Sequence, residues 1–163
     1  MGTISLGCAG HCYVLTLVGR GTIREGRTIS ECVSRADLDG MRSLLLDLSE
    51  VDYLDSTCLG TLVALHQRFN RGATPRFTVA APLAHLKKLV GATKLDTILP
   101  RVDSAPVTAE TLEIPNAIMD GPTLAAFVID CHRKLAETGG SDSASFMLVA
   151  EMLAREGHPR PSK

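Results

Sequence analysis

Ser56 and Thr57 carry hydroxyl groups at a point where a strand candidate is followed by a helix candidate, and this position suits a phosphate group. Residues 44–48, mostly leucine, have the apolar character of a strand that is covered on both faces. From residue 59 to 69, apolar residues recur at helical spacing, so a helix begins close to Ser56. The N–H groups of a first helical turn stabilise negative charge. The pattern predicts phosphorylation at Ser56, with Thr57 as the second choice.

The simplest interpretation of the same segment is structural. Asp55 and Ser56 are both favourable N-cap residues, and capping is the ordinary use of Asp-Ser before an apolar-periodic run. Local pattern alone favours this interpretation and leaves open which of the two residues is the cap.

A longer stretch around these residues resembles the signature of the STAS domain family, which is typified by bacterial anti-sigma factor antagonists. Residues 47–62 read Asp-Leu-Ser-Glu-Val-Asp-Tyr-Leu-Asp-Ser-Thr-Cys-Leu-Gly-Thr-Leu. The family pattern is an apolar strand, Asp-Leu-Ser, a short turn, Asp-Ser-Ser/Thr-Gly-Leu-Gly and an amphipathic helix. Cys58 takes the place of the first glycine. The likeness extends over about residues 3–103.

Strand and helix candidates alternate along this region. The expected strands are 3–8, 12–18, 42–48, 76–80 and 97–102, and the expected helices are 26–39, 56–71 and 82–90. The first two strands suit a hairpin, and the later alternation suits parallel crossovers. The predicted fold class is α/β, a STAS-like mixed β-sheet packed by α-helices.

The remainder of the chain predicts an added helical unit. We assign residues 1–103 to a STAS-like domain, 104–121 to an irregular connector with one helical turn near residues 108–112, 122–157 to a C-terminal helical hairpin, and 158–163 to a flexible tail. The apolar faces of the hairpin either complete the core or meet another subunit, and their spacing does not separate these outcomes. Homodimerisation or partner binding through residues 122–157 is slightly favoured, because the STAS-like part is complete by Val102.

Composition excludes several classes of partner. The chain has 163 residues and a formal net charge of −1, so it has no overall attraction to nucleic acid. It lacks an apolar run of the roughly 18 to 20 residues that span a membrane, and its N-terminus has no secretion-signal pattern. We expect a cytoplasmic protein that neither binds nucleic acid nor inserts into a membrane.

We expect no catalytic residues, metal or cofactor. The histidines are scattered, and none falls in a pattern that pairs it with a serine or cysteine nucleophile. Cys8, His11 and Cys12 lack the second Cys/His pair of a zinc site, and the odd total of five cysteines suits reduced thiols. Gly19-Arg20-Gly21 lacks the remaining residues of a phosphate-binding loop. The chain is therefore not expected to be an enzyme.

The family resemblance implies a protein-binding switch. It implies that the chain, when Ser56 is unmodified, binds an anti-sigma factor that is also a serine kinase, and releases it when Ser56 is phosphorylated. A phosphatase would reverse the change. The residues expected to contact the partner are Asp52, Asp55, Ser56, Thr57, Cys58, Leu59, Arg20 and Thr22.

One departure from the family pattern keeps other functions open. Gly19-Arg20-Gly21-Thr22 stands where antagonists have Gly-Glu-Leu-Asp, so two acidic residues are absent. Arg20 could pair with a phosphate on Ser56, face an acidic partner, or be an ordinary surface residue. The alternatives are a scaffold subunit of a signalling assembly, an accessory subunit of a lipid or anion transporter, and a module that senses a small ligand above the signature helix.

Overall fold

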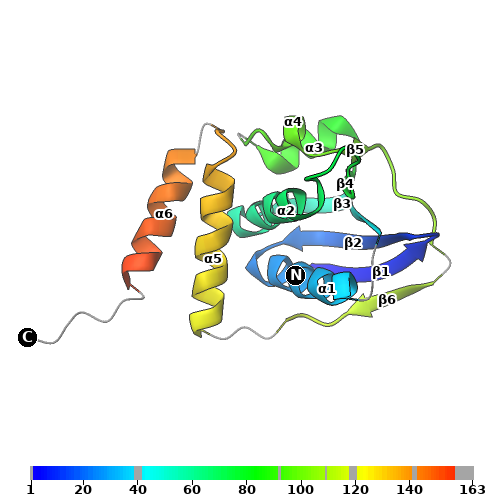
Figure 1. Cartoon of the computed structure of the whole chain (residues 1–163), viewed down its shortest axis with the longest axis horizontal. Helices are drawn as coiled ribbons and strands as arrows, with labels where there is room; N and C mark the ends of the chain where they lie inside the picture. Colours follow the sequence, from blue (N-terminus) through cyan, green and yellow to red (C-terminus); the bar gives the residue numbers. More distant parts are fainter. Residues whose placement is uncertain are drawn as a thin grey trace, which may run out of the picture.

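A single mixed sheet with helices packed against it forms the centre of the structure (Figure 1). The computed structural model describes residues 2–38, 42–91, 93–108, 110–117, 121–140 and 143–156. The sheet has six strands in the order β5-β4-β3-β2-β1-β6. The predicted α/β class is confirmed. In chain order the elements are β1 (Thr3–Ala9), β2 (Cys12–Gly21), α1 (Ile23–Leu38), β3 (Ser43–Leu54), α2 (Ser56–Phe69), β4 (Phe77–Ala80), α3 (Leu83–Val90), α4 (Leu95–Ile98), β5 (Arg101–Val102), β6 (Thr111–Ile114), α5 (Gly121–Ala136) and α6 (Ser143–Glu156).

Strand β3 lies in the middle of the sheet and is covered on both faces, as its leucine run predicts. It pairs in parallel with β2 on one side and with β4 on the other. Leu44, Leu46 and Leu48 belong to the main core with the apolar residues of α1 and α2. Leu45 points to the opposite face and packs in a smaller cluster with Val14. Period-two alternation thus distributes one leucine run over two layers.

The central strand is longer than its apolar run suggests. We expected β3 to end at residue 48, but it continues to Leu54, because Val51 and Leu54 are buried and stay paired with β2 through two register shifts. A bulged strand of this kind can extend past the regular ladder. As a consequence only Asp55 separates β3 from α2.

Two segments differ from their predicted form. The segment 97–102, expected to be a strand, contains the end of the short helix α4 and only the two-residue strand β5. The connector, expected to be irregular with a helical turn, supplies β6, which pairs antiparallel with β1. Without β6 the seven residues of β1 would form an open sheet edge, and this pairing covers most of it. The tail 158–163 lies outside the described residues.

The two C-terminal helices form a hairpin that packs against α2 through α5 (Figure 1). Cys131, His132 and Leu135 of α5 are buried, and Leu135 belongs to the main core. One face of the hairpin therefore completes the domain, which was one of the two outcomes left open. Leu148 and Met152 of α6 remain exposed, and a homodimer through them stays a prediction. No helix in the described part of the chain is long and apolar enough to cross a membrane.

A buried glutamate closes the N-terminus of α1. Glu25 accepts hydrogen bonds from the backbone N–H of Thr22 at 2.9 Å and from that of Gly2 at 3.3 Å, and Thr22 Oγ1 also donates to it. Burial by itself would raise the pKa of Glu25, but these hydrogen bonds outweigh it and leave the pKa below its ordinary value of 4.5. The ionised carboxylate therefore stabilises the fold above that value, and this contribution is lost as the pH falls through the folded-state pKa.

We predict that Glu25→Gln lowers the free energy of unfolding by about 1–3 kcal/mol at pH 7, because it removes hydrogen bonds to a charged group. The deficit should shrink as the pH falls below 4.5 and through the lowered folded-state pKa of Glu25, because the wild-type carboxyl then also becomes protonated. Urea denaturation at several pH values measures this. Glu31→Gln, which removes a partly exposed ion pair with Arg27, is the control and should change stability by well under about 1 kcal/mol. A Glu25→Gln deficit that does not vary with pH would contradict the assignment.

Candidate functional site

Asp55 caps α2, and this decides which of the two candidate residues has that role. Its backbone is extended, with φ −80° and ψ 171°, and the N–H of Cys58 donates to Asp55 Oδ1 at 2.8 Å. The backbone N–H groups of Thr57 and Ile23 also hydrogen-bond to this carboxylate. Burial raises the pKa of Asp55, although these bonds oppose the shift and the charge of Glu25 adds to it. We expected first-turn donors to be available to a phosphate, but Asp55 already uses those of Thr57 and Cys58.

Ser56 is half-buried and makes a hydrogen bond to α5. Its Oγ lies 2.9 Å from Nε2 of His132, and Nδ1 of His132 lies 2.8 Å from the carbonyl oxygen of Val128. Because a carbonyl only accepts, Nδ1 carries a proton, and in a neutral ring Nε2 is then an acceptor. In that tautomer the hydroxyl of Ser56 is the donor to His132. The ring of Phe146 in α6 packs edge-on against this imidazole, with ring centroids 6.1 Å apart.

His132 is a site residue that the sequence analysis did not pair with Ser56. The two residues are 76 positions apart and lie in different units of the predicted organisation. The available signal was its spacing, because His132 follows Val128 by four residues and precedes Leu135 by three, which places it on the apolar face of α5. A histidine on such a face needs a polar partner, and the sequence does not show where that partner lies.

The remaining predicted contact residues divide into an exposed and a covered group. Asp52 and Arg20 are exposed, and the Arg20 guanidinium stacks over the ring of Tyr53, 4.4 Å from its centroid. Tyr53 is itself 44% exposed. The covered residues are Thr57, Cys58 and Leu59, which are 5%, 0% and 7% exposed. Thr22 is partly exposed and is held by Glu25.

This division bears on what each residue can do. A phosphate on Thr57 would require α2 to move, whereas Ser56 Oγ is covered only in part. Burial raises the pKa of the Cys58 thiol far above its ordinary value, so the reactive thiolate is scarce there. The exposed surface next to Ser56 in sequence is thus made of Asp52 and Tyr53, with Arg20 stacked on the tyrosine.

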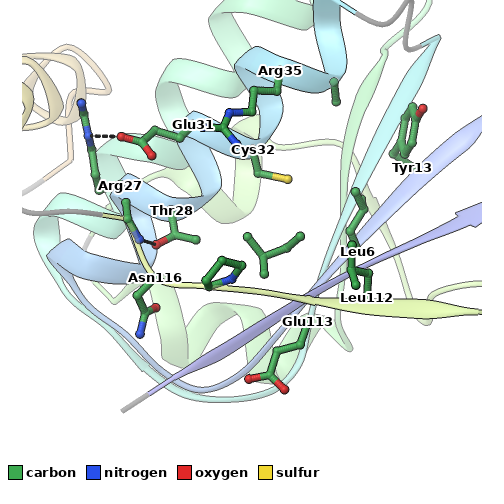
Figure 2. Close-up of a pocket in the computed structure, with 14 residues that line it drawn as sticks. Leu6, Tyr13, Arg27, Thr28, Glu31, Cys32, Arg35, Leu112, Glu113 and Asn116 are labelled. Atoms are coloured by element: carbon green, nitrogen blue, oxygen red, sulfur yellow. Dashed lines mark hydrogen bonds and ion pairs between the residues drawn. The ribbon is translucent and has the colours of Figure 1, made fainter.

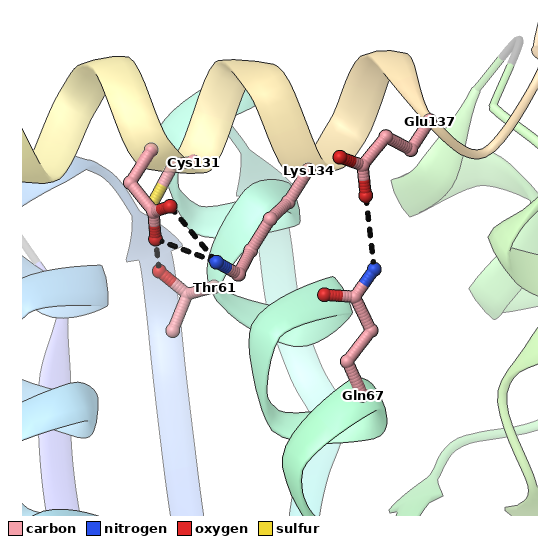
Figure 3. A network of polar contacts seen from close by, with 6 residues as sticks. Thr61, Gln67, Cys131, Lys134 and Glu137 are labelled. Atoms are coloured by element: carbon pink, nitrogen blue, oxygen red, sulfur yellow. Dashed lines mark hydrogen bonds and ion pairs between the residues drawn. The ribbon is translucent and has the colours of Figure 1, made fainter.

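Gly60 allows α5 to approach the backbone of α2. A Cβ atom at this position would lie 2.3 Å from the carbonyl oxygen of Cys131, which is closer than real Cβ contacts. Beside it, Thr61 Oγ1 lies 3.7 Å from the sulfur of Cys131 (Figure 3). The signature glycine thus serves a close contact between helices.

A cavity of about 770 Å³ lies elsewhere, between α1 and the strands β1 and β6 (Figure 2). Leu6, Leu112 and Ile114 give it an apolar side, and Arg27 and Arg35 of α1 also line it. None of the described residues that line this cavity belongs to α2, whereas the small-ligand alternative placed a site above that helix. Among the described residues no group of three or more His, Cys, Asp or Glu side chains is arranged to hold a metal ion.

Comparison with known proteins identifies the family. A family model described as "Mlab, STAS domain" matches residues 4–100, which is more than half of the chain. The chain belongs to the STAS domain family. A solved structure of an anti-sigma factor antagonist from Mycobacterium paratuberculosis is 21% identical in sequence to this STAS protein, and the match covers 64% of this chain and 87% of that one with a TM-score of 0.49. None of the curated proteins matches it.

We predict that Asp55→Ala lowers the free energy of unfolding of this STAS protein by about 1 kcal/mol, because it removes the N-cap of α2. Asp55→Asn keeps a capping oxygen and removes a charge that burial disfavours, so it should be at least as stable as wild type at pH 7. Thermal and urea denaturation of the three proteins test this. Equal losses for both variants would show that the charge, and not the cap, is what stabilises this helix.

Proposed function

We propose that this STAS protein is a phosphorylation-switched protein-binding module that acts as an anti-sigma factor antagonist. In this proposal it binds an anti-sigma factor that is also a serine kinase while Ser56 is unmodified, and it releases that partner once Ser56 is phosphorylated. A phosphatase restores binding. The observation that supports this most is the position of Ser56, the first residue of α2, whose hydroxyl takes no part in capping the helix.

A hydroxyl that is not needed for the local fold can be modified without unfolding the domain. The cap of α2 is Asp55, and the covered neighbours Thr57 and Cys58 hold the first turn against the core. In the transfer, Ser56 Oγ bonds to the γ-phosphorus of ATP, the bond from that phosphorus to the ADP oxygen breaks, and the hydroxyl proton passes to a base of the kinase. The product is ADP and a phosphoserine with about −1.5 to −2 charges at pH 7.

Charge explains why a partner would leave. The new phosphate lies next to the carboxylate of Asp55, which already takes the donors of Thr57 and Cys58. It would also add to the charge of Asp52 on the exposed side. A partner surface that fits a neutral hydroxyl would bury these charges unpaired, at a cost of several kcal/mol. A loss of about 2.7 kcal/mol weakens binding about a hundredfold.

The exposed residues next to Ser56 in sequence suit a protein partner. Tyr53 and Arg20, stacked on each other, are of the residue types enriched in protein interfaces. Arg20 stands where antagonists carry acidic residues, so the partner of this protein should present an acidic group at that point.

We predict that Ser56→Ala retains a partner that Ser56→Asp loses. The test is purification of tagged variants from the native host, with bound proteins identified by mass spectrometry. Ser34→Asp places the same charge on the exposed side of α1 and should retain the partner. Because Asp55 is the cap, the Ser56 variants should lose no more than the roughly 1 kcal/mol of one hydrogen bond.

The identity of the retained protein decides between the proposal and its alternatives. An anti-sigma factor with kinase activity supports the antagonist function. An ATPase or a permease would instead indicate a transporter subunit, and equal retention by Ser56→Ala and Ser56→Asp would refute the switch.

The hydrogen-bonded pair Ser56 and His132 also raises the question of hydrolysis, and we propose that the protein is not a hydrolase. Val128 supplies a neutral carbonyl where a hydrolase uses a carboxylate, and Asp55 places a negative charge beside the serine. The N–H groups of Thr57 and Cys58, which could stabilise an oxyanion, are directed to Asp55.

We predict that a fluorophosphonate probe does not label Ser56. The measurement is intact-mass and peptide mass spectrometry after incubation with the probe, with a serine hydrolase as positive control. Labelling at Ser56 that is lost in His132→Ala would show an activated serine and refute the proposal that the protein is not a hydrolase.

A further inference from the structure

A helix of the same chain covers the side of α2 that carries Ser56. α5 packs along α2 and buries Cys131, His132 and Leu135 (Figure 1). α6 packs on α5, with Ala150 fully buried, and supports it through Phe146. The hairpin is thus a second layer over the signature helix.

Two contacts fix the position of α5 on α2. The first is at Gly60, where the absence of a side chain lets the carbonyl of Cys131 approach, so that a Cβ there would be 2.3 Å from its oxygen. The second is the hydrogen bond from the Ser56 hydroxyl to His132 at 2.9 Å. Ser56 and Gly60 both belong to the STAS signature. The hairpin therefore contacts residues that the proposed partner would also contact.

The docked position of α5 also depends on the chemical state of Ser56. The hydroxyl proton is donated to Nε2 of His132, and phosphorylation removes that proton. A phosphoryl group that took the direction of this proton would not fit in the 2.9 Å gap between Oγ and the imidazole. Phosphorylation of Ser56 therefore removes one of the two contacts that hold α5 in its docked position.

α5 packs mainly on α2 and α6, so it can move away from α2 without breaking the pairing of the strands. Of the 16 residues of α5, three are buried. Among the described residues, its polar contacts with α2 are the Ser56–His132 hydrogen bond and the Thr61–Cys131 pair at 3.7 Å, and Glu137, directly after α5, accepts a hydrogen bond from Gln67 at 3.2 Å on the exposed side (Figure 3). Regions with few buried contacts are the ones that open locally.

The geometry points to an intramolecular competitor: the hairpin α5–α6 occupies the surface of α2 that a partner binds, and a partner or kinase reaches Ser56 only when the hairpin moves away. This inference rests on the proposed function, because it takes Ser56 as the residue the partner reads. The partner class that fits this surface is a helix that brings its backbone close to Gly60 and a hydrogen-bond acceptor close to Ser56.

Two cysteines of the chain report on this movement. Cys131 is 1% exposed and lies between α5 and α2, so opening of the hairpin exposes it. Cys58 is 0% exposed and lies in the main core, beside the position that a Cβ of Gly21 would take. Hairpin opening therefore exposes Cys131 alone, whereas global unfolding exposes both. Burial raises the pKa of Cys131 to about 11, which slows its alkylation while the hairpin is docked.

We predict that Gly60→Ala increases the rate of iodoacetamide alkylation of Cys131 at least tenfold and leaves Cys58 at its wild-type rate. Alanine favours a helix more than glycine, so α2 itself should remain folded. Gly121→Ala is the matched control, because a Cβ there meets nothing within 4 Å, and it should behave as wild type. Ser56→Asp, which cannot donate to His132, should also accelerate Cys131. Peptide mass spectrometry over a time course reads each thiol separately.

Several outcomes would overturn the inference. Cys131 rates that are equal in Gly60→Ala and wild type would show that the hairpin is not displaced, and Cys131 and Cys58 accelerating together would show that it belongs to one cooperative core. His132→Ala also removes the hydrogen bond to Ser56 but leaves the surface of α2 unchanged, so if it exposes Cys131 and captures no more of the partner than wild type does, the hairpin moves without competing. Equal partner retention by Ser56→Ala and Ser56→Asp refutes the switch instead, and the thiol rates then still report whether the hairpin covers α2.

Discussion

The carboxylate of Asp55 receives N–H donors from the first turns of both α1 and α2, and the arrangement of the domain follows from this. Cys58 and Thr57 donate from α2, and Ile23 donates from α1. The backbone N–H of Asp55 in turn donates to the carbonyl of Gly21 at 2.8 Å, which joins the ends of β2 and β3. Two strands end and two helices begin around this one group.

The two helix N-termini bring two carboxylates close together, and these repel each other. Glu25 lies close enough for its charge to raise the pKa of Asp55, so two acidic groups share a buried region. Each is stabilised by backbone donors, which is the usual condition for burying a carboxylate. The donors that a helix start offers to an anion are therefore already used by the protein itself. A third anion here would find the N–H groups of Thr57 and Cys58 already occupied.

The sequence predicted those parts of the site that depend on local pattern. The near-continuous leucine run identified β3, helical spacing identified α2, and the Asp-Ser pair marked the start of that helix. The continuation of β3 to Leu54 was missed because polar residues interrupt its apolar run, although this part of the strand still pairs with β2. β6 was missed because four residues in a connector pair with β1, more than a hundred positions earlier. The contact of Ser56 with His132 depends on how two helices dock, and no local pattern records docking.

The pairing of β6 with β1 bears on where this domain ends. The family match stops at residue 100, yet β6 covers an edge that the matched region leaves open. With β6 in place, the sheet is bounded by strands of two and four residues. Short edge strands give neighbouring molecules little backbone to pair with, which limits edge-to-edge aggregation. By supplying β6, the segment after residue 102 thus limits association of this protein with other molecules through its sheet edge. The folded domain therefore extends at least to Ile114.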